Sequence, residues 1–597
     1  MHRFRNVLSS SVAVGIAGNA AFAGGFAWQT IANNGQAMPG SASLFNSYNQ
    51  PSVNSDGLVV FRARSKGPEQ PVRGVYASHA GSGGPVSVVA QVSDEVPQPN
   101  NTPGIGGEGL ATFREFPSFP RIDAVSDMIA TRAQSQPTWT YLLADGTETR
   151  VGTAGVFATV GGELRTGASL LGAVTDAGTG ALVFPWWQVP GTAPGTRFDQ
   201  FPGAASPCDG EFIVFKGNWT DVAAATGRTG VYFRSMTAMG GNAPVTRIAD
   251  STMLIPDQPK GGTVPFGSTA PPSAAFGAAV FLGLDSEEAP TMGGIYLAAL
   301  EADPELRSIV RIGDPVPGAD PGSTFARIGE ALSFDGRWAA FWGAWGTRMT
   351  PRLLTCPEDG NADLIAFCNE EYPDGFLVEV PEHQGFFAAD VISGVVVPIA
   401  MTGDGIDDMM YWNFSGSPPG SGEGDEGGDQ ELPRWRSASF VAVAGTGPGT
   451  FQAAFKARSG SVDSIYLRNG PYGPAASPLV GTSTPGQSVD AQSPAGSTVT
   501  AVGIERDALR GGRLAMTASM LDAVTGESWA GVYVANVPGA QGCLGDLNGD
   551  GSVGGADLGL LLTEWGCTAS CAADVDGDGT VGGSDLGLMM TAWGRCR

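Results

Sequence analysis

The tripeptide Gly230-Val231-Tyr232 belongs to a signature, glycine followed by an apolar and then an aromatic residue, that recurs along this chain. The other copies are Gly74-Val75-Tyr76, Gly155-Val156-Phe157, Gly294-Ile295-Tyr296, Gly385-Phe386-Phe387, Gly531-Val532-Tyr533 and the degenerate Ser464-Ile465-Tyr466. Short β-branched or aromatic segments bounded by glycine are typical of β-strands. Seven similar strands in one chain predict a repeating, mainly β architecture.

Each copy of the signature is preceded by another apolar segment that usually ends in Phe. These segments cover residues 57–61, 128–130, 212–215, 279–281, 338–341, 452–455 and 514–516. A third, Ile-Ala-like segment follows the signature and is clearest at residues 31–35, 247–250, 311–314 and 399–404. Small antiparallel units of this kind cannot bury their faces alone, so we expect a seven-bladed β-propeller-like body. A row of independent β-sandwiches is the alternative.

The spacing of the signature predicts long loops between some strands. Its copies lie about 76 residues apart on average, whereas a propeller blade usually takes roughly 40–45 residues. Residues 415–430, which are nearly all Gly, Ser, Pro and acidic residues, are one expected insertion.

The phase of the repeat predicts how the body closes. The chain begins with a strand of the last type in the repeat, residues 28–31, and the body ends with a signature strand, residues 531–534. If these two segments pair, they complete one blade and leave no free sheet edge.

The composition narrows the classes of protein that fit. Of the 597 residues, 42% are hydrophobic and 15% are charged, with 89 Gly and 42 Pro, which favours a turn-rich β protein over a disordered chain. The net charge is −26. Because phosphate binding relies on clustered Lys and Arg, we expect no nucleic-acid partner.

The N-terminus carries an export signal. Arg3 and Arg5 precede an apolar stretch over residues 7–17 and then Ala21-Phe22-Ala23, a small-x-small cleavage pattern. We expect a signal peptide over residues 1–23 and an extracellular or cell-surface protein. No later apolar run approaches the roughly 20 residues of a transmembrane segment. The β body is then expected over residues 24–541 and a separate module over residues 542–597.

The C-terminal module contains two twelve-residue loops with oxygen ligands at positions 1, 3, 5 and 12 and glycine at position 6. The predicted side-chain ligands are Asp546, Asn548, Asp550 and Asp557 in the first loop and Asp574, Asp576, Asp578 and Asp585 in the second. Ser552 and Thr580, at position 7, would each add a backbone carbonyl. This spacing is the one that Ca²⁺ requires, so we expect two bound calcium ions.

Apolar residues after each loop have helical spacing. They are Leu558, Leu561, Leu562 and Trp565, then Leu586, Met589, Met590 and Trp593. This duplicated loop-helix resembles a type I dockerin, which implies an EF-hand-like domain that docks to a cohesin-like partner. It departs from that family at loop position 9, which is Gly554 or Gly582, and at positions 10 and 11, so the partner's identity does not transfer.

The body carries a weaker resemblance. Residues 54–61 are similar to the Asn-x-x-Gly-x-x-Ala-Phe tandem repeat of secreted bacterial β proteins. This resemblance implies an exported protein and names no reaction.

Seven cysteines are unevenly placed, and export permits disulfides. In the C-terminal module we prefer the pairs Cys543–Cys596 and Cys567–Cys571, although spacing leaves other pairings open. Cys356 and Cys368 would close an insertion loop. Cys208 is left over, either as a buried small side chain or as a reactive thiol.

No catalytic or organic-cofactor motif stands out in the sequence. Two histidines remain after the signal peptide, His79 and His383. The acidic pairs Glu287-Glu288, Glu370-Glu371 and Asp407-Asp408 are expected in solvated loops. We therefore favour a secreted, non-catalytic binding or scaffold protein. The alternative is an extracellular glycoside hydrolase that acts on a polysaccharide through two carboxylates and carries a dockerin.

Overall fold

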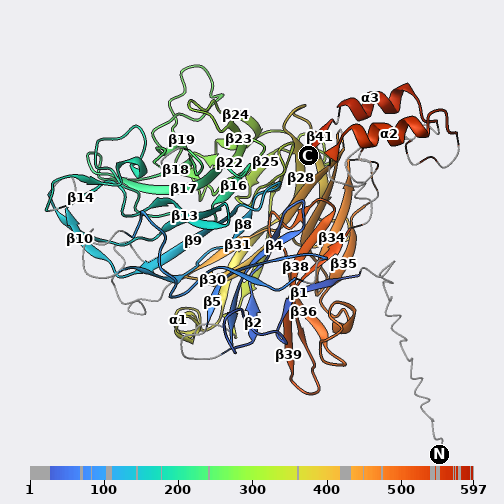
Figure 1. The fold of residues 1–597 in the computed structure, drawn as a ribbon, viewed down its shortest axis with the longest axis horizontal. Helices are drawn as coiled ribbons and strands as arrows, with labels where there is room; N and C mark the ends of the chain where they lie inside the picture. The colour runs from blue at the N-terminus through green and yellow to red at the C-terminus, as the bar shows by residue number, and fades with distance from the viewer. Residues whose placement is uncertain are drawn as a thin grey trace, which may run out of the picture.

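The computed structural model describes most of the chain between residues 27 and 595. The described ranges are 27–66, 72–81, 84–101, 110–142, 146–176, 178–238, 242–358, 362–416, 432–447, 449–471, 473, 475–537, 545, 547, 552–568, 571, 573, 575, 580–591 and 593–595. The predicted signal peptide, residues 1–23, lies outside them. The described residues form a mainly β protein built from several antiparallel sheets (Figure 1). None of their helices is long and apolar enough to cross a membrane.

Seven sheets in the described residues share one strand order. In each sheet the Phe-type strand and the signature strand are the two central strands. The sheets are β2 (Phe45–Tyr48), β4 (Leu58–Ser65), β5 (Arg73–His79), β6 (Ser87–Gln91); β7 (Thr112–Glu115), β9 (Ile129–Gln136), β12 (Gly155–Val160), β13 (Glu163–Ser169); β16 (Ser206–Cys208), β17 (Phe212–Asp221), β18 (Thr226–Ser235), β19 (Thr246–Asp250); β20 (Ser268–Thr269), β22 (Ala278–Leu284), β23 (Gly293–Ala299), β24 (Arg307–Arg311); β25 (Phe325–Ile328), β27 (Trp338–Leu354), β28 (Phe376–Asp390), β29 (Val396–Met401); β32 (Val441–Gly447), β33 (Thr450–Ser459), β34 (Val462–Gly470), β35 (Ser477–Gly481); and β36 (Thr498–Gly503), β38 (Arg513–Leu521), β39 (Ser528–Asn536), β1 (Gln29–Asn33).

In five of these sheets the first strand is interrupted, and a second short strand pairs with the same neighbour. The short strands are β3 (Ser52–Val53), β8 (Arg121–Ile122), β21 (Ser273–Ala275), β26 (Ser333–Phe334) and β37 (Leu509–Arg510). The five short strands, together with β16 and β32, contact one another in sequence. The order is β3, β8, β16, β21, β26, β32, β37 and back to β3. The innermost strands of the seven sheets therefore contact one another in a closed cycle.

A buried ion-pair cluster joins three of these sheets at or beside their short inner strands. Arg121, on β8, places its Nε 2.5 Å from Asp507 Oδ2, and Arg510 Nη2 lies 3.2 Å from Asp507 Oδ1. Burial alone would raise the pKa of Asp507, but the Arg121 and Arg510 guanidinium groups hold it below its ordinary value. Arg121 also donates to Pro272 O at 2.7 Å. The cluster thus ties together three sheets that lie far apart in sequence.

The glycine of the signature permits a recurring irregularity. In each of the seven sheets the register between the signature strand and its outer neighbour shifts at this point, as between Ile295 and Tyr296 in β23. A Cβ atom on Gly294 would lie 2.0 Å from Val310 O, so the strands can approach only without a side chain. In the degenerate copy the glycine lies on the outer strand instead, because Ser464 of the signature strand β34 pairs with Gly481 of β35.

The predicted pairing of the chain's first and last body strands is confirmed. β1 pairs antiparallel with β39, with Gln29 opposite Val534 and Asn33 opposite Gly531. The Asn33 side chain donates to Asp490 Oδ2 at 2.9 Å, and Trp529 Nε1 and Tyr533 Oη donate to the same oxygen at 3.0 and 3.1 Å. The buried carboxylate of Asp490 therefore fixes β1 to β39 of the last sheet. β1 and β39 lie close together in Figure 1.

Several insertions have more structure than the expected loops. One forms a sheet of β11 (Glu148–Val151), β10 (Trp139–Leu142), β14 (Val174–Thr175) and β15 (Leu182–Val183), followed by the 3-10 turn η1 (Pro185–Trp187). Others form α1 (Ala362–Glu371), the hairpin β30 (Tyr411–Ser415) and β31 (Arg434–Ala438), and η2 (Gly486–Ser488). The insertion sheet forms because Trp139 and Tyr141 bury their rings against the neighbouring core. Most of the expected insertion at residues 415–430 lies outside the described residues.

The described cysteines of the body follow expectation. Cys356 and Cys368 form a disulfide with a Cα–Cα distance of 5.8 Å, which fixes α1 to the end of β27. Cys208 is buried, and burial raises the pKa of its thiol. It therefore acts as a small core side chain rather than as a reactive thiol.

Candidate metal centre

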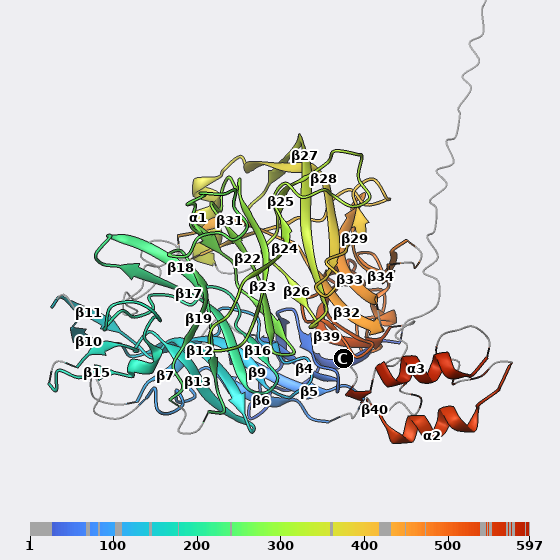
Figure 2. The same cartoon turned by 90° about the horizontal axis from the view of Figure 1, so that it is seen from above.

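The described residues of the C-terminal module form two short helices and a two-stranded sheet. Its elements are α2 (Gly555–Thr563), α3 (Gly583–Thr591), β40 (Ser552–Val553) and β41 (Gly594–Arg595). Val553 pairs with Gly594, which brings the beginning and the end of the module together. Both helices lie outside the β body in two views at right angles (Figures 1 and 2).

Four of the ten predicted calcium-site residues are described: Ser552, Asp557, Thr580 and Asp585. The other six, Asp546, Asn548, Asp550, Asp574, Asp576 and Asp578, lie outside the described residues. In the part of the chain that is described, no group of three or more His, Cys, Asp or Glu side chains could hold a metal ion. The calcium loops therefore stay a prediction.

The two aspartates at loop position 12 have the same surroundings. Asp557 is buried and accepts hydrogen bonds from the backbone N–H groups of Leu547 and Gly554, both at 2.8 Å. Asp585 is also buried and accepts from Val575 and Gly582, both at 2.6 Å. Each carboxylate thus joins loop position 2 to loop position 9. It also lies in the first turn of its helix, where negative charge is favourable.

A carboxylate at loop position 12 is one of the oxygen ligands that a Ca²⁺-binding loop requires. Both carboxylates are buried where the predicted loop meets its helix. The arrangement of Asp557 and Asp585 is therefore compatible with the predicted role of a calcium ligand.

The core of the module follows the sequence repeat. Val553 and Val581 occupy equivalent positions, as do Leu561 and Met589, and all four are buried. The apolar residues expected on the helices form two rows, of which one is buried and one is half exposed. The half-exposed row consists of Leu562, Trp565, Met590 and Trp593, with exposed fractions of 54%, 49%, 54% and 47%. A module of this size has too little interior to cover both rows of apolar side chains.

The predicted pair Cys567–Cys571 is confirmed, with a Cα–Cα distance of 6.1 Å. The other predicted pair, Cys543–Cys596, lies outside the described residues.

Sequence reasoning missed a role for Glu564. Its Oε2 accepts from the backbone N–H of Ala573 at 2.8 Å, which joins the end of α2 to the start of the second loop. The one available signal was that Glu564 is the only acidic residue of the module outside a ligand position.

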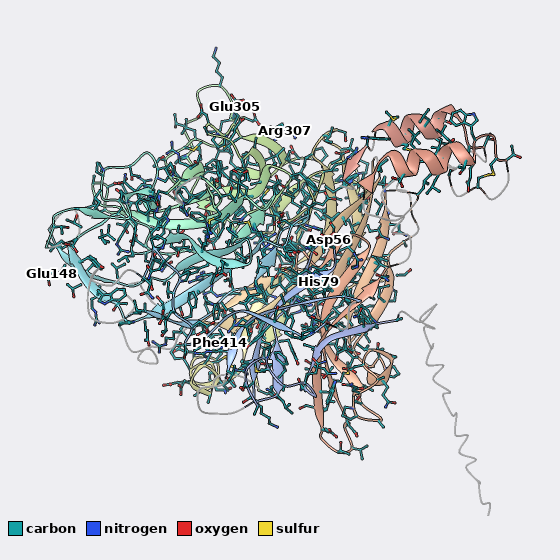
Figure 3. The ribbon with its side chains drawn as sticks, in the orientation of Figure 1. Asp56, His79, Glu148, Glu305, Arg307 and Phe414 are labelled. Carbon is teal, nitrogen blue, oxygen red and sulfur yellow. A yellow bond between two sulfur atoms is a disulfide. The ribbon has the colours of Figure 1, made fainter. Side chains whose placement is uncertain are left out.

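The candidate catalytic groups of the body do not form a visible active site in the described residues. His383 stacks on Trp345 with ring centroids 5.8 Å apart, while His79 ends β5 (Figure 3). Figure 3 also shows Glu148 and Glu305 on separate outlying segments. The expectation of a solvated loop is wrong for Asp408, which is buried and accepts from Arg352 Nη1 and from Gln384 Nε2. Glu370 and Glu371 lie at the end of α1.

Comparisons with known proteins identify no family. No family model and no curated protein matches the chain. Among solved structures, the chain is similar to an oligogalacturonate lyase in complex with manganese, with 9% identity, a TM-score of 0.37, and coverage of 86% of this chain and 97% of that one. It is also similar to the polysaccharide lyase Uly1, with 10% identity, a TM-score of 0.33, and coverage of 84% and 91%. Prolyl oligopeptidase B from Galerina marginata has 8% identity, a TM-score of 0.33, and coverage of 82% and 52%. Because these TM-scores are below 0.5, the function has to be argued from the chain itself.

Proposed function

We propose that this protein is a secreted, non-catalytic binding protein whose C-terminal module is a type I dockerin. The module would take up two Ca²⁺ ions and attach the β body to a cohesin-like partner. The observation that carries this proposal is the matched pair Asp557 and Asp585, each buried at loop position 12 and each joining positions 2 and 9 of its loop.

Exposed apolar side chains on the module support a docking role. Leu562 and Met590 occupy equivalent positions, as do Trp565 and Trp593, and all four are about half exposed. Large apolar side chains gathered on a small surface are typical of protein-binding sites. The cohesin-like module is the partner that fits, because the duplication presents the same apolar pair twice.

For the body we propose a seven-bladed β-propeller. The shared strand order of the seven sheets, the closed cycle of contacts among their inner strands, and the pairing of β1 with β39 support it. In a ring of this kind each sheet buries both faces against its neighbours. The broad, rigid surface that results suits a binding role.

Calcium titration of the full chain by calorimetry tests the function of the module. We expect about two Ca²⁺ ions per chain, since each ion needs one complete loop. Replacing Asp546 or Asp574 by Ala should remove tight binding at one site and weaken docking to a cohesin. The control is Asp303→Ala, because Asp303 is an exposed acid of the body. If the unsubstituted chain takes up no calcium, the dockerin assignment fails.

The non-catalytic role of the body has its own test. Asp408 is paired with Arg352, Glu370 and Glu371 lie at the end of α1, and Glu148 and Glu305 lie on separate segments. We therefore expect no release of sugar from a polysaccharide panel. Release that one Asp or Glu substitution in residues 24–541 abolishes would establish a glycoside hydrolase instead.

A further inference from the structure

A cleft between two neighbouring sheets of the body has a volume of about 170 Å³. Its lining residues are Gln98, Pro99, Arg165, Thr166, Arg234 and Met236. Arg165 and Thr166 lie on β13, Arg234 lies on β18, and Gln98 and Pro99 precede β7. Among the described residues that line the cleft, two carry a guanidinium group and none carries a carboxylate.

Arg234 is a fixed positive charge in the wall of this cleft. Its side chain is buried, with an exposed fraction of 3% for the residue. Its Nε donates to Ala243 O at 2.6 Å, and its Nη1 donates to Thr166 O at 3.0 Å and Gly167 O at 3.1 Å. Burial lowers the pKa of Arg234 to about 10, so the group still carries its charge at neutral pH. A charge held in such surroundings acts on an anion more strongly than it would in water.

Thr166 adds a hydrogen-bond donor that the described protein does not satisfy. The residue has an exposed fraction of 3%, and its hydroxyl is buried with no hydrogen-bond partner among the described residues. Leaving such a group unpaired costs free energy. Because Thr166 lines the cleft, a rotation of its side chain would let the hydroxyl donate to an acceptor oxygen of a ligand there and recover that cost.

Arg165 completes the cleft from the solvent side. Its side chain is exposed and lines the same space as Thr166 and Arg234. A guanidinium group can donate two parallel hydrogen bonds to a carboxylate or sulfate. Arg165 reaches solvent, so its side chain can adjust to a ligand. Arg234 is fixed by backbone carbonyls, so its positive charge stays at one place in the wall of the cleft.

We propose that this cleft binds the oxyanion group, carboxylate or sulfate, of a small acidic solute, and that an acidic sugar unit is its natural occupant. A cavity of about 150 Å³ accommodates a benzene-sized ring, so the cleft has room for one six-membered sugar ring. This inference rests on the proposed binding role of the body and gives that role a site and a ligand class. It uses no residue of the C-terminal module.

Calorimetry of the full chain at pH 7 and physiological salt tests the proposal. The salt screens the general repulsion between an anion and a protein of net charge −26. The probes are D-glucuronate, D-glucose and inorganic sulfate, because the first two share one ring and differ in the carboxylate. We expect glucuronate to bind and glucose not to bind. Sulfate binding would place the recognition in the oxyanion itself, and its absence would assign the site to carboxylates.

Two substitutions separate the roles of the side chains. Arg165→Gln and Thr166→Val should each weaken glucuronate binding by about tenfold, the usual effect of losing one charge-assisted or buried hydrogen bond. Arg327→Gln is the matched control, since Arg327 is an exposed arginine on β25, in another sheet. It should leave the affinity unchanged.

The melting temperatures of the ligand-free variants show whether a loss of binding arises from a loss of folding. Thr166→Val removes an unpaired hydroxyl and keeps the shape of the side chain, so its melting temperature should equal or exceed that of the unsubstituted protein. Equal affinities for glucuronate and glucose, no binding of either, or an affinity indifferent to both substitutions would overturn the proposal. Because calcium binding can be measured on the same samples, failure of this site is distinguishable from failure of the proposed function of the module.

Discussion

Gly294 marks the closest backbone approach in the signature, and it gives a prediction at the scale of one residue. A Cβ atom at this position would lie 2.0 Å from Val310 O, so Gly294→Ala must push β23 and β24 apart. We expect a loss of stability of about 1–3 kcal/mol, the usual cost of overpacking a core. Urea denaturation followed by tryptophan fluorescence measures it.

The matched control for Gly294 is Gly227 on β18, where a Cβ atom would meet nothing within 4 Å. Gly227→Ala should leave the urea midpoint unchanged or raise it slightly, since alanine restricts the unfolded chain. Equal effects of the two substitutions would show that the signature glycine serves some purpose other than close approach.

Lys456 gives a pH-dependent prediction at the same scale. Its Nζ lies 3.9 Å from the centroid of the Tyr411 ring, and burial lowers the pKa of the half-buried amine to about 8. Between pH 8 and about 10 the unfolded state then binds more protons than the folded state, so this group's contribution to stability improves as the pH rises. Lys456→Met should be more stable than the unsubstituted protein at pH 7, and the difference should narrow towards pH 10. Paired thermal melts across this range check it.

At the scale of elements, β1 completes the last sheet of the body through its pairing with β39. A chain that begins at Gly35 lacks β1 and leaves β39 with an unpaired edge, which promotes association with other chains. It should melt at a lower temperature and form oligomers in sizing chromatography. A chain that begins at Ala27 keeps β1 and should remain as stable as the longer protein. If the two chains behave alike, β1 does not secure the closure.

The elements also show what could be predicted from sequence. The central strands were predictable because a glycine, an apolar residue and an aromatic residue recur in phase with the fold, and the pairing of β1 with β39 followed from that phase. The sheet around Trp139 and Tyr141 was not predictable, because its strands are short and depend on packing against a neighbouring sheet. The burial of Asp408 likewise depends on Arg352 and Gln384, which are distant in sequence.

At the scale of the whole molecule, the body and the C-terminal module have separate cores. The calcium loops stay a prediction, which the sequence allows because ligand spacing within one loop is local; the described first-turn aspartates Asp557 and Asp585 have the same surroundings in both copies. The division of the helices into buried and exposed apolar rows was not predictable, because spacing gives the face of a helix but not the amount of interior available to cover it. The cleft at Arg165 and Arg234 joins two sheets and leaves no local pattern.

This separation predicts that the full chain melts in two calorimetric transitions. The buried core of the module, which includes Val553, Leu561 and Met589, contains no residue of the body's clusters. Acidic side chains gathered in the two predicted loops repel one another, so bound calcium should supply much of the module's folding free energy. Chelation should therefore lower the smaller transition and leave the larger one within about 1 °C, and Asp557→Asn should act on the same transition. A chelator that shifts both transitions together would mean that the two parts fold as one unit, and a chelator that shifts neither would mean that calcium does not stabilise the module.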